Sequence, residues 1–267
     1  MSFIDWLYSK RPEGLDHKSL PWDTLHILVL LGCIGVIILL ALLLRKRSEK
    51  AKYIAIFVIA MGILLFEIVR RIVNFTREGF DWNDWNSIAY TLIPRPWCAI
   101  SCWMIISSVF VKKKFLYNFA AITALLNAII FFAYPDAGFK NHIAFEEVYS
   151  IGTHCLLLIG SISMITLGHT DFRYNRGKEK IWWEYICYAG VFLYAFLEIA
   201  LNIENDPLYF MPGNGVTDVV PLPYPLYVVV YIIFVFGIWT NAFYLIPLLV
   251  NKLKAKFAKY IILGSRN

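Results

Sequence analysis

Residues 53–74 read YIAIFVIAMGILLFEIVRRIVN, an apolar stretch that is long enough to cross a bilayer and yet contains charged side chains near its end. At about 1.5 Å per residue, such a helix covers the roughly 30 Å of hydrocarbon in a typical membrane. A charge at the bilayer centre costs about 3 kcal/mol on an insertion scale, so Glu67, Arg70 and Arg71 are expected to face the interior of a helix bundle. This stretch therefore predicts both a membrane fold and the place of a polar site.

Apolar blocks of similar length recur along the whole chain. Hydrophobic residues make up 59% of the 267 positions, and the mean hydropathy is +0.61, well above that of an ordinary soluble domain. We therefore expect an all-α, polytopic membrane protein, a single membrane domain over residues 1–267 that forms a bundle of seven transmembrane helices rather than six. The predicted helices cover about residues 23–44, 53–74, 95–111, 115–133, 145–167, 183–203 and 225–249.

The basic residues predict the orientation of the chain. Most of the 25 Lys and Arg residues lie in the segments 45–52, 112–114 and 168–181 and in the tail from Asn251 onward. Short loops rich in Lys and Arg stay in the cytoplasm, so we expect the N-terminus outside, the C-terminus in the cytoplasm and a multi-pass protein of the cell membrane. The net charge of +6 is accordingly a topology signal, and we predict no binding to nucleic acid.

The cysteines follow neither a disulfide framework nor the ligand spacing of a zinc site. The five are Cys33, Cys98, Cys102, Cys155 and Cys187. All lie in or beside apolar segments and lack His partners at zinc-site spacing, so we predict no metal and no cofactor. Residues 1–22 are polar and mixed, without the apolar core of a cleavable signal peptide, so the first helix is expected to direct insertion.

Polar side chains gather at similar depth in the outer half of the predicted bundle. Glu67, Arg70, Arg71 and Asn74 follow the i, i+3, i+4, i+7 spacing of one helical stripe. Counting at about 1.5 Å per residue from the predicted helix ends brings a thiol, an imidazole and further polar groups to comparable depth. These candidates are Cys98, His154, His26, Glu198 and Asn202. We therefore predict a polar cavity in the outer half of the bundle.

Two segments are expected to border this cavity on the outer side. Residues 75–94 contain Trp82 and Trp85, three apart, and suggest a short helix at the outer membrane interface. Residues 204–225 combine several prolines with the run Gly-Asn-Gly, which excludes a continuous helix. We predict that this second segment forms an ordered cap over the bundle.

Two interpretations of the polar residues remain open at this point. In the first, the Glu and Arg side chains neutralise one another and serve only to fix helix packing. In the second, His154 activates a cysteine thiol for nucleophilic attack, with the carboxylates as orienting groups. Cys98 opens the third predicted helix and Cys102 lies one turn deeper, so either sulfur could be the nucleophile.

One motif stands where the third predicted helix begins. Residues 93–98 read IPRPWC and supply Pro94 and Cys98 of a Pro-x-His-x-Cys element, with Pro96 in place of its His. Three further parts of the same pattern are Glu67 late in the second helix, His154 within the fifth and residues 207–211 (PLYFM) after the sixth. On these residues the chain resembles a family of seven-helix integral membrane proteins typified by the bacterial YwaF proteins. The eukaryotic transmembrane ether-phospholipid acyltransferases are related to that family.

The resemblance implies that Cys98 and His154 act as a pair in acyl transfer on a lipid acyl ester, as an acyltransferase or a hydrolase. His154 would take the thiol proton, and Arg70 or Arg71 would hold the phosphate of a phospholipid substrate or help to stabilise an oxyanion. The other polar residues of the outer half are expected to line the substrate site. Membrane lipids are thus the expected partners, and the oligomeric state is left open.

A non-catalytic protein is the alternative. Pro96 in place of the family His suits a lipid-binding member without turnover, whereas seven helices with an outer N-terminus also suit a receptor or a small-molecule transporter. The predicted helix 225–249 contains no Lys, which excludes a retinal Schiff base there. The sequence shows no internal repeat of the kind that underlies inverted-repeat transporters.

The uneven distribution of Lys and Arg makes the topology testable. A reporter fused after Asn267 should lie in the cytoplasm, and a reporter inserted within 204–225 should lie outside. Paired fusions to green fluorescent protein, which is fluorescent in the cytoplasm, and alkaline phosphatase, which is active outside, measure both positions. A C-terminal reporter found outside would contradict the predicted orientation.

Overall fold

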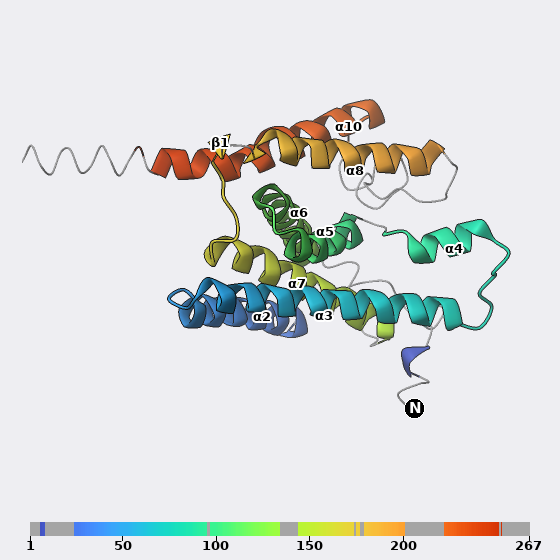
Figure 1. Cartoon of the computed structure of the whole chain (residues 1–267). Helices are drawn as coiled ribbons and strands as arrows, with labels where there is room; N and C mark the ends of the chain where they lie inside the picture. The colour runs from blue at the N-terminus through green and yellow to red at the C-terminus, as the bar shows by residue number, and fades with distance from the viewer. Residues whose placement is uncertain are drawn as a thin grey trace, which may run out of the picture.

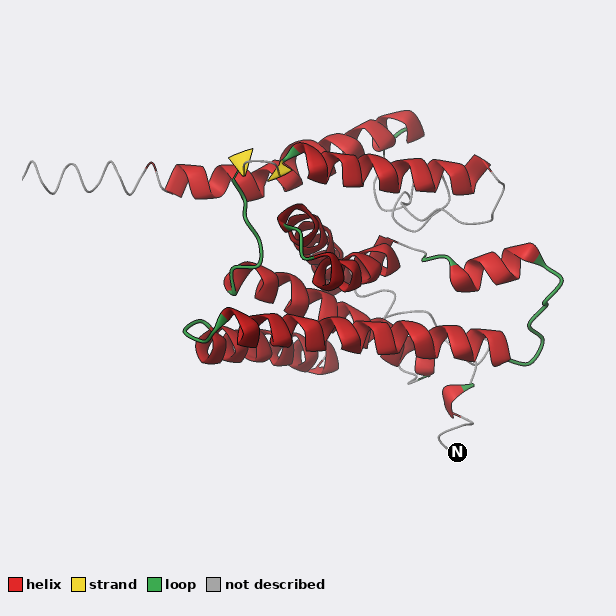
Figure 2. Ribbon diagram, viewed as in Figure 1, coloured by secondary structure: helices red, strands yellow, loops and turns green. Residues whose placement is uncertain are grey.

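Helices account for nearly all of the secondary structure. The computed structural model describes residues 6–8, 24–94, 97–133, 144–173, 175–176, 179–200, 222–250 and 252. Within these ranges the strands are β1 (Asn175–Arg176) and β2 (Glu179–Lys180), which pair antiparallel as a short hairpin (Figure 2). The prediction of an all-α protein is therefore correct apart from this hairpin, which lies in the segment 168–181.

The helices coincide with the apolar ranges of the sequence. In chain order they are α2 (Thr24–Leu44), α3 (Glu49–Thr76), α4 (Trp85–Leu92), α5 (Trp97–Val111), α6 (Lys114–Ala133), α7 (Phe145–Thr166), α8 (Trp182–Ala200) and α10 (Tyr224–Ile232). α10 continues directly into the π-helix η2 (Ile233–Thr240) and on to Val250. α4 is the short helix expected within residues 75–94, whereas nearly all of the segment 204–225 lies outside the described residues.

Length and composition allow five of these stretches to cross a membrane. They are Thr24–Leu44, Glu49–Thr76, Lys114–Ala133, Phe145–Thr166 and Leu226–Val250. α5 is apolar but has only 15 residues. That length rises about 22 Å, less than the roughly 30 Å of a hydrocarbon core. The chain is thus a helical membrane protein, while a crossing by α5 and by α8, and with it the count of seven, stays a prediction.

The helices are arranged in three layers (Figure 1). α2, α3 and α7 lie together on one side, and α8 runs beside α10 and its continuation on the other. α5 and α6 fill the space between these two groups, where α6 packs against α7, α5 and α8. α3 packs against both α5 and α7, so the polar stripe of α3 can meet side chains from two neighbouring helices.

Burial in α2 and α6 reflects their different places in the bundle. α2 buries only His26, Cys33 and Ile37, whose spacing of seven and four residues makes one narrow stripe against α7. Val29, Leu30, Leu40 and Leu44 are partly buried against the core, and most of its other apolar side chains are exposed, as expected for a helix that faces lipid. α6 is buried on most of its surface and contains small residues that let other helices approach. These are Ala120, Ala121, Ala124 and Ala128.

A close approach at Gly152 brings α7 against α3 beside the polar stripe. A Cβ atom at this position would lie 2.7 Å from the ring of Phe66, so any side chain larger than hydrogen would displace that ring or the helix that carries it. Gly160 has a similar role two turns further along α7, where a Cβ would lie 3.2 Å from Ile59 of α3. These glycines allow α3 and α7 to pack closely enough to share hydrogen bonds.

The C-terminal helix is tied to its neighbours by its π-helical turn. The Thr240 hydroxyl donates to the carbonyl oxygen of Val235 at 2.7 Å, five residues earlier, and lies 2.9 Å from the Tyr188 hydroxyl of α8. The indole N–H of Trp239 donates to the carbonyl oxygen of Ile122 in α6 at 3.0 Å. The wider turn therefore directs polar side chains toward both α6 and α8.

A buried polar cluster that the sequence did not predict joins α6, α8 and the C-terminal helix. Asn118 donates to Glu184 Oε1 at 2.9 Å and to the carbonyl oxygen of Asp171 at 2.7 Å, and it accepts from the Asp171 backbone N–H at 2.8 Å. The Tyr244 hydroxyl donates to the same Glu184 oxygen at 2.7 Å. Asn118, Glu184 and Tyr244 have fully buried side chains. We call these three residues the Asn118 cluster.

Removal of Asn118 should destabilise the protein more than removal of a matched asparagine. Asn118→Ala takes a donor away from the buried Glu184 carboxyl group and should cost about 2 to 3 kcal/mol. Asn127→Ala, also on α6, removes a partly buried bond to Ser101 and should cost about 1 kcal/mol. Thermal unfolding in detergent, followed with a thiol-reactive dye, compares the two. Equal falls in Tm would show that the Asn118 cluster contributes no more than an ordinary hydrogen bond.

Candidate functional site

The polar stripe of α3 lies at the end of the bundle where α3 ends and α7 begins, next to α4. We call this the α4 end. Glu67 is fully buried there, and its carboxyl group has a partner for each oxygen. Oε1 accepts a 2.5 Å hydrogen bond from the Tyr149 hydroxyl of α7, and Oε2 forms an ion pair with Nη1 of Arg71. A buried carboxylate needs such partners, because an unpaired charge in low dielectric is strongly destabilising.

The guanidinium of Arg71 is fully engaged within the helix bundle. Besides pairing with Glu67, it donates to the backbone carbonyl oxygens of Glu67 at 3.0 Å and Leu92 at 3.2 Å. It also lies over the indole ring of Trp103 in α5, 5.2 Å from the ring centroid. Arg71 therefore neutralises Glu67 and fixes the C-terminal end of α4 against α3.

Arg70 has a different environment although it is the next residue in the chain. Its guanidinium lies over the Tyr149 ring, 5.4 Å from the centroid. Its Nε and Nη2 atoms are buried and have no hydrogen-bond partner in the described structure. Arg71 already neutralises the charge of Glu67. The guanidinium of Arg70 is therefore a further positive charge at the α4 end, and part of its hydrogen-bonding capacity is unused in the described structure.

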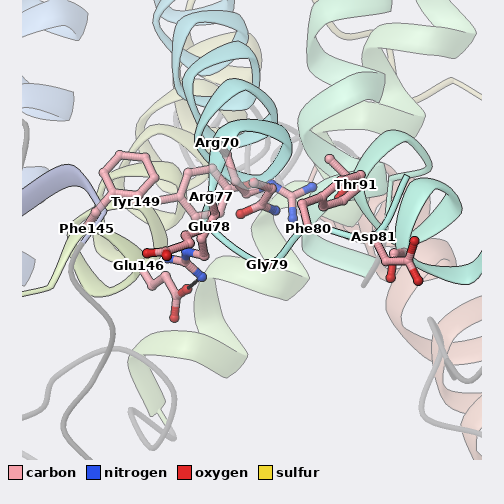
Figure 3. Close-up of a pocket in the computed structure, with 12 residues that line it drawn as sticks. Arg70, Arg77, Glu78, Gly79, Phe80, Asp81, Thr91, Phe145, Glu146 and Tyr149 are labelled. Carbon is pink, nitrogen blue, oxygen red and sulfur yellow. Dashed lines mark hydrogen bonds and ion pairs between the residues drawn. The ribbon is translucent and has the colours of Figure 1, made fainter. Parts of the chain in front are cut away.

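Arg70 borders a cavity of about 570 Å³ at the α4 end (Figure 3). Arg77, at the C-cap of α3, donates to Glu146 of α7 at 2.9 Å, while its Nε and Nη2 are also buried and unpaired in the described structure. The cavity is lined by Arg70, Asn74, Arg77, Glu78, Gly79, Phe80, Asp81, Ser87, Thr91, Phe145, Glu146 and Tyr149. The lining thus carries two guanidiniums and three carboxyl groups, those of Glu78, Asp81 and Glu146. The buried, unpaired N–H groups of Arg70 and Arg77 are donors that an anionic group of moderate size could accept from.

α4 forms one wall of the cavity and is held by its own cap. Asp84 accepts hydrogen bonds from the backbone N–H groups of Asn86 at 3.1 Å and Ser87 at 2.9 Å, and from the Ser87 hydroxyl at 2.7 Å. These bonds, those to Ser87 above all, hold the pKa of Asp84 below its usual value. Ser87 and Thr91, one turn apart, present the polar face of α4 to the cavity.

Cys98 lies in the first turn of α5, a helix that packs against α3 and its polar stripe. Its side chain is half-buried, whereas Cys102, one turn further along, is fully buried. Both are free thiols. Cys98 is therefore the more accessible of the two candidate nucleophiles.

His154 lies on α7, and its ring packs against α6. Its ring stacks on Phe131 with 3.8 Å between ring centroids, and its Nδ1 atom lies 2.7 Å from the carbonyl oxygen of Ser150. Among the described contacts, no hydrogen bond joins the His154 ring to the Cys98 thiol. The pairing of these two residues stays a prediction.

The remaining predicted site residues lie elsewhere or outside the described residues. His26 is buried between α2 and α6, where its ring stacks on Phe132 at 5.9 Å, and it is not among the residues that line the cavity. Glu198 lies in α8, but its side chain is outside the described part of the structure. Asn202 and Pro96 also lie outside the described residues.

Three residues of the site were missed from the sequence: Tyr149, Arg77 and Glu146. Tyr149 is one of many aromatic residues in the predicted helices, and composition alone does not single it out, although it lies five residues before the predicted site residue His154. Arg77 follows the polar stripe at the next helical step after Asn74 and could have been included in it. In addition, groups of three or more side chains able to hold a metal ion do not occur among the described residues.

The fold and this cluster define a helical membrane protein with a buried ion pair and an adjoining cavity, lined by charged side chains, at one end of its bundle. The family model described as the TMEM164 family, a family of transmembrane proteins, matches residues 21–243 of the chain. This match covers most of the 267 residues, and the chain belongs to that family. No curated protein and no solved structure matches it.

The pairing of Glu67 with Arg71 can be tested with a double-mutant cycle. Glu67→Gln and Arg71→Gln should each cost about 3 to 5 kcal/mol, because each leaves an unpaired buried charge, and the double variant should cost less than the two together. The matched cycle of Arg77→Gln and Glu146→Gln removes a more exposed pair and should show a coupling of about 1 kcal/mol or less. Thermal or denaturant unfolding in detergent measures both cycles. Additive effects at Glu67 and Arg71 would contradict the buried pair.

Proposed function

We propose that this protein binds a phospholipid with the phosphate at Arg70 and transfers one acyl chain of the lipid through Cys98. In this proposal the chain crosses the cell membrane seven times, with the N-terminus and the α4 end outside and the C-terminus in the cytoplasm. The cavity then opens toward the outer leaflet. The relationship to the YwaF proteins and to the eukaryotic transmembrane ether-phospholipid acyltransferases is part of the same proposal.

The observation that carries the proposal is the state of Arg70. Two of its nitrogen atoms are buried beside a cavity and have no hydrogen-bond partner in the described structure. Leaving buried polar groups unpaired costs about 1 to 3 kcal/mol each, more for charged groups, so such a site favours a ligand that supplies acceptors. A phosphate oxygen fits this requirement well, because a guanidinium presents planar, charge-assisted donors to it.

Acyl transfer would proceed through a thioester. The Cys98 sulfur attacks the ester carbonyl carbon, a C–S bond forms, and the ester C–O bond breaks to release the alcohol of the lysolipid. His154 takes the thiol proton and returns it to the departing oxygen; because its Nδ1 faces the Ser150 carbonyl, Nε2 would have to do so. A hydroxyl of an acceptor lipid, or water, then attacks the thioester and releases Cys98. Glu67 and Arg71 would hold the site in shape beside the thiol.

A non-catalytic lipid-binding protein is the second candidate. It is favoured by the His154 ring, which stacks on Phe131 without a hydrogen bond to Cys98 in the described structure, and by Pro96 at the motif position that carries His in the family. In that case the cavity would bind the headgroup as proposed, and no thioester would form. The two candidates share one binding site and differ in a single covalent step.

Labelling with a phospholipid that carries an alkyne acyl chain separates the two candidates. In nanodiscs the parent protein should acquire a hydroxylamine-sensitive label that is absent from Cys98→Ala and His154→Ala. Cys102→Ala and the control Cys187→Ala should retain the label. Loss with Cys102→Ala alone would move the nucleophile one turn deeper, and no label in a lipid-bound parent would favour the non-catalytic candidate.

Removal of the Arg70 guanidinium tests the headgroup site itself. Arg70→Gln should weaken phospholipid binding by roughly 2 kcal/mol, or about 30-fold, because a charge-assisted pair of hydrogen bonds is lost. Arg173→Gln removes an exposed arginine that pairs with Asp171 in the loop after α7, and it should leave binding unchanged. Equilibrium binding of labelled lipid to the purified variants gives both values. Unchanged binding by Arg70→Gln would overturn the proposed site.

A further inference from the structure

Three aromatic side chains form a compact surface where α3 ends. Phe75 stacks on Trp82 with 5.1 Å between ring centroids, and Phe80 lies edge-on to both, 5.1 Å from Phe75 and 4.9 Å from Trp82. Gly79, with a φ of +83°, makes the turn that returns the chain to Phe75. We call Phe75, Phe80 and Trp82 the aromatic ledge. Trp82 remains 61% exposed, so its ring is available to a partner.

The aromatic ledge continues the lipid-facing side of α3. Leu65, Ile68 and Ile72 follow the i, i+3, i+7 spacing of one helical face and are all exposed. Phe75 is the next position of this face, three residues after Ile72. Because α3 is long and apolar enough to span a membrane, this face would contact acyl chains, and the ledge extends that apolar contact to the helix end.

The aromatic ledge also borders the cavity of Arg70. Phe80 belongs to both, since it packs against the other two rings and lines the cavity (Figure 3). On α4, Ser87 faces the cavity while Trp85 is 64% exposed. Apolar side chains therefore run from the lipid-facing side of α3 to the rim of a cavity that contains unpaired guanidinium donors, an arrangement that suits an amphiphile.

We propose that the aromatic ledge, together with Trp85, binds the upper part of the acyl chains of the phospholipid whose headgroup occupies the cavity. The lipid then reaches Arg70 sideways from the outer leaflet and keeps its chains in the bilayer. This inference rests on the proposed function and names the chain-binding part of the same site. Tryptophan suits this place, because its ring prefers the boundary between headgroups and hydrocarbon.

Two ligands that differ only in the acyl chains test the inference. sn-Glycerol 3-phosphate has the glycerol and phosphate alone, and dioleoylphosphatidic acid adds only the two acyl chains. The double variant Trp82→Ala/Trp85→Ala should bind glycerol 3-phosphate like the parent but bind the diacyl lipid about tenfold more weakly. The matched variant Leu193→Ala/Leu197→Ala removes two exposed apolar side chains from α8 and should bind both ligands like the parent.

The outcomes distinguish this inference from the proposed function. Unchanged affinity of the Trp variant for the diacyl lipid, or an equal loss for both ligands, overturns the aromatic ledge as a chain-binding surface. If the parent binds the diacyl lipid in a Trp-dependent way but is unaffected by Arg70→Gln, the ledge stands and the headgroup site is wrong. Trp82→Phe/Trp85→Phe, which keeps aromatic surface, should recover most of the affinity; failure to do so in a stably folded variant also counts against the ledge.

Discussion

The buried carboxyl group of Glu67 is the constraint on which the α4 end depends. It lies in a helix that is long and apolar enough to span a membrane, where an unpaired charge is strongly destabilising. Tyr149 from α7 and Arg71 from α3 satisfy its two oxygens, and this requires α7 to approach α3 closely. Gly152 permits that approach, because the ring of Phe66 occupies the space where a side chain would be. The close packing of α7 on α3 and the neutralisation of Glu67 therefore depend on each other.

The same pairing separates two adjacent arginines into different roles. Successive residues of a helix point about 100° apart, so Arg70 and Arg71 face different neighbours. Arg71 forms an ion pair with Glu67, donates a hydrogen bond to the end of α4 and lies over the Trp103 ring. Arg70 is left with the face of the Tyr149 ring on one side and the cavity on the other. The unpaired guanidinium at the cavity wall is thus a consequence of how Glu67 is neutralised.

The sequence predicts the helices well because their length and apolar composition are local properties. The ranges 23–44, 115–133 and 145–167 nearly coincide with α2, α6 and α7. The stripe from Glu67 to Asn74 was likewise predicted, since helical spacing places its members on one face. The different roles of Arg70 and Arg71 were not predicted, because they depend on Tyr149, which is 82 positions from Glu67 in the sequence. The Asn118 cluster was missed for the same reason, although Glu184, a carboxyl group within a predicted helix, was a visible signal.

The central claim is that Arg70, and not Arg71, contacts the phosphate of a bound lipid. Solid-state NMR in phospholipid bilayers can measure dipolar coupling between guanidinium ¹⁵N and lipid ³¹P in protein labelled at arginine. We expect one of the guanidinium signals that couple to ³¹P to disappear in Arg70→Lys, because the phosphate oxygens accept hydrogen bonds from Arg70, and we expect every coupled signal to remain in Arg71→Lys. An unchanged set of coupled signals in Arg70→Lys, or the loss of one in a folded Arg71→Lys variant, would contradict the claim.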